Sequence, residues 1–163
     1  SQKNSGGIFG TNTNAVSEKE LIVSNCYSTG AISGDEAGGI FANRTNFIAS
    51  GTITVTNCYS SGTISGKDAG GIFGLMANYH SSGTITVTNC YSSGTISGNY
   101  AGGIFGDSAN RDSNGGTITV TNCYSTGAIS GGLAGASLAA LLGGAWQEHD
   151  QRFLQEHVLQ EHV

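Results

Sequence analysis

The sequence predicts an all-β fold, a parallel β-solenoid (β-helix) of about four coils with three short strands in each coil. A unit recurs along the chain: Asn-Cys-Tyr-Ser begins at residues 25, 57, 89 and 122, at spacings of 32, 32 and 33. Each unit contains a segment such as Thr-Ile-Thr-Val-Thr, whose alternation with a period of two is typical of a half-buried strand. One unit cannot bury its apolar face alone, so we expect equal units to stack on one another.

One unit, residues 51–82, shows the predicted elements in order. Residues 52–56 form the first strand, "GTISG" around Ile64 the second, and "GGIFG" around Ile72 and Phe73 the third. The segment that follows changes in length and chemistry from unit to unit, which predicts a surface loop. At the end of the repeats, "GGLAG" from Gly131 is interpreted as a weakened copy of "GGIFG".

Composition and charge exclude several classes of partner. The chain has 163 residues, 27 glycines, no proline and a net charge of −5. It has no basic stripe, so we expect no nucleic-acid partner. Its longest apolar run, residues 133–146, is interrupted by Gly and Ser and is shorter than the ~20 residues that span a bilayer, so we expect no membrane span.

The chain divides into a β-solenoid of repeats over residues 1–132 and a helical cap and tail over residues 133–163. The tail is rich in Ala, Leu, Gln and Glu, which favour helices. We expect residues 133–142 to cover the last coil and a second helix to span residues 145–162. His157 and His162 are five residues apart rather than four, so we interpret the tail histidines as a solvated face and predict no metal site.

Two recurring motifs carry a resemblance to a known family. "GGIFG" begins at Gly6, Gly70 and Gly102, with "GGIFA" at Gly38, and each copy is followed by "NCYSSG" or "NCYSTG". These motifs resemble the GLUG-motif repeats, which have a Gly-Gly-Leu-Val-Gly-like core and an Asn-Cys-Tyr-x-Thr-Gly-like segment. The resemblance covers residues 6–135. It implies a solenoid and an adhesin-like microbial protein that is secreted or located at the cell surface, and it supplies no catalytic residues.

The threonines of the first strand are predicted to face outward. Nine of them form a flat array with spacings of ~6.7 Å along a strand and ~4.8 Å between coils: Thr52, Thr54, Thr56, Thr84, Thr86, Thr88, Thr117, Thr119 and Thr121. Such a face resembles the Thr-x-Thr faces of antifreeze solenoids and suits ice or another regular surface. It is equally what a solenoid needs for solubility, and the first coil departs from it with Glu20, Ile22 and Ser24.

Three further ladders follow from the Asn-Cys-Tyr-Ser motif. We expect a turn with left-handed backbone and bonded amides at Asn25, Asn57, Asn89 and Asn122. The turn resets the alternation, so a free-thiol ladder is expected to face inward at Cys26, Cys58, Cys90 and Cys123. A ladder of aromatic rings is expected to face outward at Tyr27, Tyr59, Tyr91 and Tyr124.

The Ile-Phe pair of "GGIFG" predicts an exposed apolar stripe. Adjacent residues of a strand point to opposite faces, so one of the two ladders must lie outside. We favour the isoleucines inside and an outward stripe that another chain covers, formed by Phe9, Phe41, Phe73 and Phe105.

The chemistry of an enzyme is not visible. The acids of the repeats do not recur together, and we found no nucleophile, phosphate-loop or metal motif, so we predict no enzymatic activity and no cofactor. The predicted function is structural and adhesive, with self-assembly into a fibre or stalk through stacked coils and apolar ladders. Ice or surface binding through the threonine face is the alternative, and carbohydrate binding or processing, with a polysaccharide partner, is a weaker one.

Overall fold

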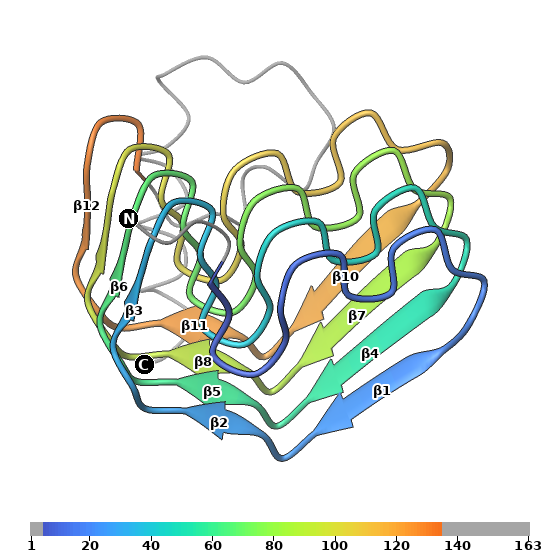
Figure 1. Ribbon diagram of the computed structural model, residues 1–163. Helices are drawn as coiled ribbons and strands as arrows, with labels where there is room; N and C mark the ends of the chain where they lie inside the picture. The colour runs from blue at the N-terminus through green and yellow to red at the C-terminus, as the bar shows by residue number, and fades with distance from the viewer. Residues whose placement is uncertain (1–4, 135–163) are drawn as a thin grey trace.

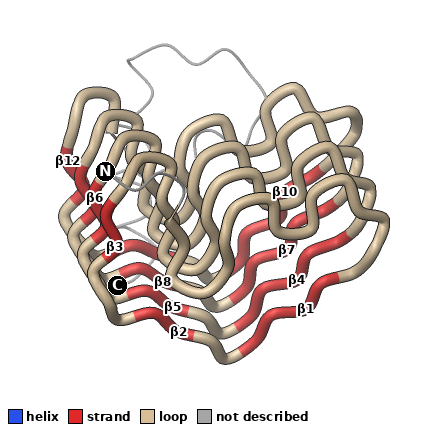
Figure 2. The backbone as a smooth tube through the Cα atoms, viewed as in Figure 1, coloured by secondary structure: helices blue, strands red, loops and turns tan. Residues whose placement is uncertain are grey.

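The computed structural model describes residues 5–134, and this part of the chain is built of twelve strands and loops without a helix (Figure 2). The strands are parallel and stack as a β-solenoid of about three turns, which confirms the all-β, parallel-solenoid part of the prediction; the fourth coil and the helical cap stay predictions. Of the predicted helices, only Leu133 and Ala134 are described, in and after a turn; the remainder of both helices lies outside the described residues.

Three four-stranded parallel sheets form the walls of the solenoid (Figure 1). The first contains β1 (Leu21–Ser24), β4 (Thr52–Thr56), β7 (Thr84–Thr88) and β10 (Thr117–Thr121). The second contains β2 (Tyr27–Ser28), β5 (Tyr59–Ser60), β8 (Tyr91–Ser92) and β11 (Tyr124–Ser125). The third contains β3 (Ile32–Ser33), β6 (Ile64–Ser65), β9 (Ile96–Ser97) and β12 (Ile129–Ser130). Loops close the remaining side, which is the upper side in Figure 1.

Pairing is in register, so each residue lies beside its equivalent in the next unit. Val55 pairs with Val23 on one side and Val87 on the other, and Tyr59 pairs with both Tyr27 and Tyr91. The first predicted strand is confirmed as β4 and its equivalents, and Ile53 and Val55 point inward with no exposed surface. The second predicted strand is confirmed at the Ile-Ser pair of β6.

The third predicted strand is wrong. In "GGIFG" only single bridges form, at the first glycine and at the phenylalanine of each copy. The third strand of each coil is instead the Tyr-Ser pair that follows the Asn-Cys turn.

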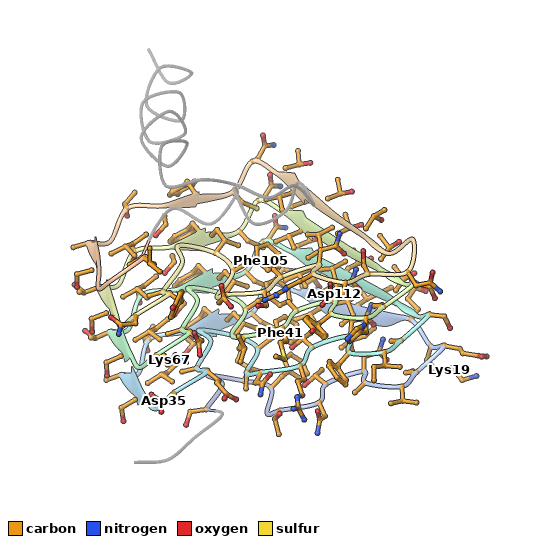
Figure 3. The ribbon with its side chains drawn as sticks, turned by 90° about the horizontal axis from the view of Figure 1, so that it is seen from above. Lys19, Asp35, Phe41, Lys67, Phe105 and Asp112 are labelled. Carbon is orange, nitrogen blue, oxygen red and sulfur yellow. The ribbon has the colours of Figure 1, made fainter. Side chains whose placement is uncertain are left out.

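The prediction of an outward phenylalanine stripe is also wrong. Phe41, Phe73 and Phe105 have no exposed surface, and Phe9 is half-buried at the first coil. Their rings stack at centroid distances of 4.8, 4.7 and 4.6 Å in the interior, where Figure 3 labels Phe41 and Phe105.

The isoleucines beside these phenylalanines are buried as well. Ile40 and Ile72 have no exposed surface and belong to the same apolar cluster as the phenylalanines. The backbone explains this, because the amides of Ile40 and Phe41 both donate to the carbonyl of Ile72, at 3.0 and 2.8 Å. Consecutive amides of a strand point in opposite directions; here they converge, so the two side chains do not alternate between faces.

The core has two parts separated by a waist. The larger cluster contains Ile53, Val55 and Phe73 with their equivalents, and the smaller one is formed by Ile32, Ala37, Ile64, Ala69, Ile96 and Ala101. At the waist, Ser92 packs against Gly71, where an added Cβ would lie 2.6 Å from the Ser92 Cβ and 1.9 Å from the Gly103 carbonyl oxygen. Glycine is therefore required, because a side chain has no room between the coils at this point.

The interpretation of "GGLAG" as a copy of "GGIFG" is corrected by the register. Gly131 continues the corner column of Gly34, Gly66 and Gly98: the Gly98 amide donates to the Ser130 carbonyl, and all four glycines have φ between 139° and 150°. Residues 131–134 are therefore equivalent to residues 34–37, at the corner after the third sheet.

Candidate functional site: the outer face and the coil ends

The outer face of the first sheet carries the predicted threonine array. Thr54 pairs with Thr86, and Thr86 with Thr119. The threonines of β4 and β7 are half-buried, whereas those of β10, at the sheet edge, are exposed. The Oγ1 atoms of Thr84 and Thr117 lie 3.2 Å apart, so neighbouring coils are also joined through this surface. In the first coil Ile22 replaces threonine and is 64% exposed, which interrupts the array at that end.

The asparagine turn has the predicted geometry. Asn25, Asn57, Asn89 and Asn122 have φ between 52° and 55°, in the left-handed region that asparagine tolerates. In Asn57, Asn89 and Asn122, Nδ2 donates to Oδ1 of the equivalent asparagine in the preceding coil, at 3.3 Å from Asn57 to Asn25 and at 3.2 Å in the other two bonds. These bonds lie at the surface and run toward the N-terminal coil.

The cysteine ladder faces inward, and its four thiols are free. Cys58 and Cys90 are buried, and each sulfur accepts a hydrogen bond of 3.4 Å from the cysteine amide of the preceding coil. Burial raises the pKa of the Cys58 thiol, and contact with the Cys123 thiol together with burial raises the pKa of Cys90. The two central thiols are therefore protonated and unreactive, as expected for core residues.

The tyrosine ladder faces outward, as predicted, but it offers few ring faces. Neighbouring rings are parallel within 8° and their centroids are 4.9–5.3 Å apart. Each inner ring is covered by its neighbours on both faces. Only the end rings, Tyr27 at 60% exposure and Tyr124 at 46%, present a face to solvent. A sugar that stacks on an aromatic face therefore finds a platform at the ends of the ladder and not along it.

A second asparagine ladder, which the sequence reasoning missed, lies inside the loops. Nδ2 of Asn14 donates to Oδ1 of Asn46, Asn46 to Asn78, and Asn78 to Asn110, at 2.9, 2.8 and 2.7 Å. Asn46 and Asn78 are fully buried, and each also donates to a loop carbonyl, of Gly51 and Gly83, at 3.1 Å. The sequence did contain a signal for this ladder, because these asparagines recur at the 32-residue period inside segments whose other residues vary.

The waist carries polar atoms that have no partner. The hydroxyls of Ser60, Ser92 and Ser125 are buried, and the described residues offer them no hydrogen bond. A buried hydroxyl without a partner costs folding free energy, so this column is a weak point of an otherwise well-bonded interior.

Asp68 is the buried acid of the described residues, and other charged groups lie near it. Its carboxylate lies 3.5 Å from the Lys67 ammonium. The equivalent positions in the neighbouring coils are occupied by Glu36 and Tyr100. Burial raises the pKa of Asp68, and the charges of Asp107 and Glu36 raise it further while Lys67 lowers it. Within residues 5–134, no group of three or more histidine, cysteine, aspartate or glutamate side chains is arranged to hold a metal ion.

The two ends of the described solenoid differ from its middle. Ile8 is 43% exposed in the first coil although its equivalents Ile40 and Ile72 are fully buried. In the last coil, Ile118, Val120 and Cys123 are only half-buried, while their equivalents in β7 and its turn are buried. Among the strands of residues 5–134, β1–β3 and β10–β12 are the outermost, so each has one edge that no other described strand pairs with.

The chain matches no family model, no curated protein and no solved structure. Within the described part, no helix has the length and apolar character needed to cross a bilayer.

Proposed function

We propose that this chain is a structural, adhesin-like repeat protein that assembles into a fibre or stalk by stacking its coil ends. The observation that carries the proposal is the contrast between middle and end coils: side chains such as Ile8 and Ile118 are partly exposed where the equivalent residues in the middle are buried. Unpaired parallel edges recruit further strands. The first and last coils share the Asn-Cys-Tyr-Ser turn and the Ile-Ser strand, so a second copy can continue the stack at these segments.

The resemblance to GLUG-motif repeats supports the same proposal and implies a location outside the cell or at its surface. Of the four free thiols, the central ones of Cys58 and Cys90 are buried, whereas those of Cys26 and Cys123 at the coil ends are half-buried. The proposal includes a fourth coil and a helical segment over residues 133–163. For assembly, this segment has to leave the strand edges of the last coil accessible.

The phenylalanine stripe has no part in this proposal, because it is core. Among residues 5–134, the exposed large apolar side chains are found on the first coil (Ile8, Val16, Ile22 and Tyr27), on the middle coils (Ile48 and Tyr100) and on the last coil (Tyr124 and Leu133).

Sedimentation velocity at rising protein concentration, with negative-stain microscopy of the same samples, tests the proposal. We expect a monomer at low concentration and elongated species that lengthen as concentration rises. A chain that remains monomeric up to millimolar concentration, or that forms only compact closed oligomers, contradicts it.

A second candidate function, binding of ice or another regular surface, is favoured by the outward threonine array in register over β4, β7 and β10. The double variant Thr54→Tyr/Thr86→Tyr disrupts this surface at its centre and leaves the coil ends intact. We expect it to abolish thermal hysteresis or adsorption while assembly continues. If the wild type shows neither property, the threonines serve solubility and strand packing.

A further inference from the structure

We infer that copies join head to tail in the native repeat register, with the first coil of one copy (residues 6–36) lying on the last coil of the other (residues 102–133). In this arrangement Asn25 of one copy continues the column that ends at Asn122 of the other. The inference rests on the proposed self-assembly and names its partner, a second copy, together with the polarity and register of the joint.

The two asparagine ladders are the first support, because they run in opposite directions. The inner ladder donates toward the C-terminal coil and the surface ladder toward the N-terminal coil. Among the described residues, the N-terminal end therefore keeps an acceptor, Oδ1 of Asn14, and a donor, Nδ2 of Asn25. The C-terminal end keeps the matching donor, Nδ2 of Asn110, and the matching acceptor, Oδ1 of Asn122.

Only unlike ends continue both ladders. In the head-to-tail joint Asn110 donates to Asn14 of the next copy, and Asn25 of that copy donates to Asn122. If two identical ends met, any column that superposed would place an acceptor of one copy on the same acceptor of the other. Otherwise the strand direction would be reversed at the joint and no column would be aligned. The amide pattern therefore selects the head-to-tail direction of the joint as well as the contact itself.

The backbone edges are complementary in the same register. In each middle coil the asparagine-turn amide donates to the next coil, as Asn57 does to Thr88 at 3.0 Å, and the Tyr-strand amide donates back, as Tyr91 does to Cys58 at 3.1 Å. By this pattern Asn122, Ile129 and Gly131 donate across the joint to Ser24, Ala31 and Ser33. In the other direction, Tyr27 and Thr29 donate to Cys123 and Ser125.

Side chains and charges agree with the joint. Tyr27 stacks on Tyr124 and covers the two free ring faces of the tyrosine ladder, and Cys26 covers Cys123. No charged residue of one coil lies opposite a charged residue of the other. Charged residues of the first coil meet uncharged ones of the last coil, in the pairs Lys19 with Gly116, Glu20 with Thr117 and Asp35 with Gly132. Charged residues of the last coil meet uncharged ones of the first coil, in the pairs Asp107 with Thr11, Arg111 with Ala15 and Asp112 with Val16.

A charge-swap experiment on the full-length chain tests the register. Ser24 and Thr121 are exposed and face outward. They occupy equivalent positions in the first sheet but lie three coils apart within one copy, so they come together only across the joint. Like charges directly opposite are destabilising in a sheet and opposite charges are stabilising. At low salt, we expect Ser24→Lys/Thr121→Glu to associate about fivefold more tightly than Ser24→Glu/Thr121→Glu.

The matched control places the first of the two charges at a position of the same coil end that does not lie opposite Thr121. Ser33→Lys/Thr121→Glu and Ser33→Glu/Thr121→Glu carry the same net charges, but Ser33 lies in the third sheet, opposite Ser130 rather than Thr121. The two control variants should differ in affinity much less than the Ser24 pair. Circular dichroism establishes that all four variants keep the fold.

Thiol protection in the wild type provides an independent arm. The half-buried Cys26 and Cys123 should alkylate faster than the buried Cys58 and Cys90 in monomer, and should slow to the rate of those two in assemblies. If assemblies form but the Ser24 pair behaves like the Ser33 control, or the end thiols stay reactive, the register is overturned and self-assembly stands. If neither wild type nor variants associate, both proposals fail.

Discussion

Asn46 and Asn78 are joined inside the solenoid by a 2.8 Å hydrogen bond from Nδ2 of Asn46 to Oδ1 of Asn78, and both side chains are fully buried. Their amides hold the loops of successive coils together where no strand exists. The loops can therefore vary in sequence at their exposed positions while each coil still lies on the next.

Replacing Asn78 should destabilise the solenoid more than any substitution in the surface ladder. Asn78→Gly keeps the backbone, whose φ is 57°, but removes the amide and leaves its buried partners unsatisfied, at a cost of about 2–4 kcal/mol. The matched control Asn89→Gly, in the exposed ladder, should cost less than about 1 kcal/mol. Urea unfolding measures both; equal losses would contradict a structural role of the inner ladder.

Phe73 should act as a core residue. Phe73→Ala is expected to lower the free energy of unfolding by about 3–5 kcal/mol, because its ring is fully buried and stacked on both faces. Tyr91→Ala removes an equally stacked ring from the outer face and should cost about 1 kcal/mol. Thermal or urea denaturation distinguishes the two, and a stable Phe73→Ala variant that merely fails to assemble would restore the outward stripe.

Removing the Ser92 hydroxyl should leave the protein as stable or make it more stable, by up to about 2 kcal/mol, because this buried group has no partner. Ser93→Ala, one residue away and exposed, should change stability by less than about 0.5 kcal/mol. A marked loss in Ser92→Ala would mean that the hydroxyl is bonded in solution.

Asp68 should make stability depend on pH. Its pKa in the folded chain is raised above the ordinary value of 3.8, chiefly by burial, so the folded state binds the proton more tightly than the unfolded state. The associated stabilisation is complete below pH 3.8 and is lost as pH rises through the folded-state pKa. Asp68→Asn should therefore raise the melting temperature at pH 7.

The advantage of Asp68→Asn should shrink as the pH falls through the raised folded-state pKa toward 3.8, and should change no further below that value. Melting curves from pH 3 to pH 8 show this difference directly, with Glu18→Gln, at an exposed position, as the control. A melting temperature of Asp68→Asn that follows the wild type in parallel at every pH would contradict the assigned cause.

The sequence predicted the elements that obey a simple periodicity. Thr-Ile-Thr-Val-Thr alternates as a strand, and the turn at Asn57 places Cys58 inside and Tyr59 outside, as expected. The Ile-Phe pair was misassigned because alternation between faces holds only for extended strands, and "GGIFG" curves so that two amides meet one carbonyl. The glycines of this motif permit the close approach, and they were the feature of the sequence that indicated a departure from an extended strand.

The inner asparagines were overlooked for a different reason. Their segments vary in length and chemistry, which is typical of solvent-exposed loops, and only the single column of Asn14, Asn46, Asn78 and Asn110 keeps the period. Burial of a polar side chain depends on the carbonyls that surround it, such as that of Gly83 beside Asn78, and those neighbours are set by the three-dimensional winding. The complementarity of the coil ends likewise appears only once the direction of each amide is known.

Fibre diffraction from aligned assemblies tests the central claim most directly. Coils that stack end to end place their strands perpendicular to the fibre axis, so a strong reflection at ~4.8 Å is predicted on the meridian. The same reflection on the equator would show that solenoids associate side by side, and samples that yield no fibres would show that the coil ends do not recruit a second copy; either result contradicts the account.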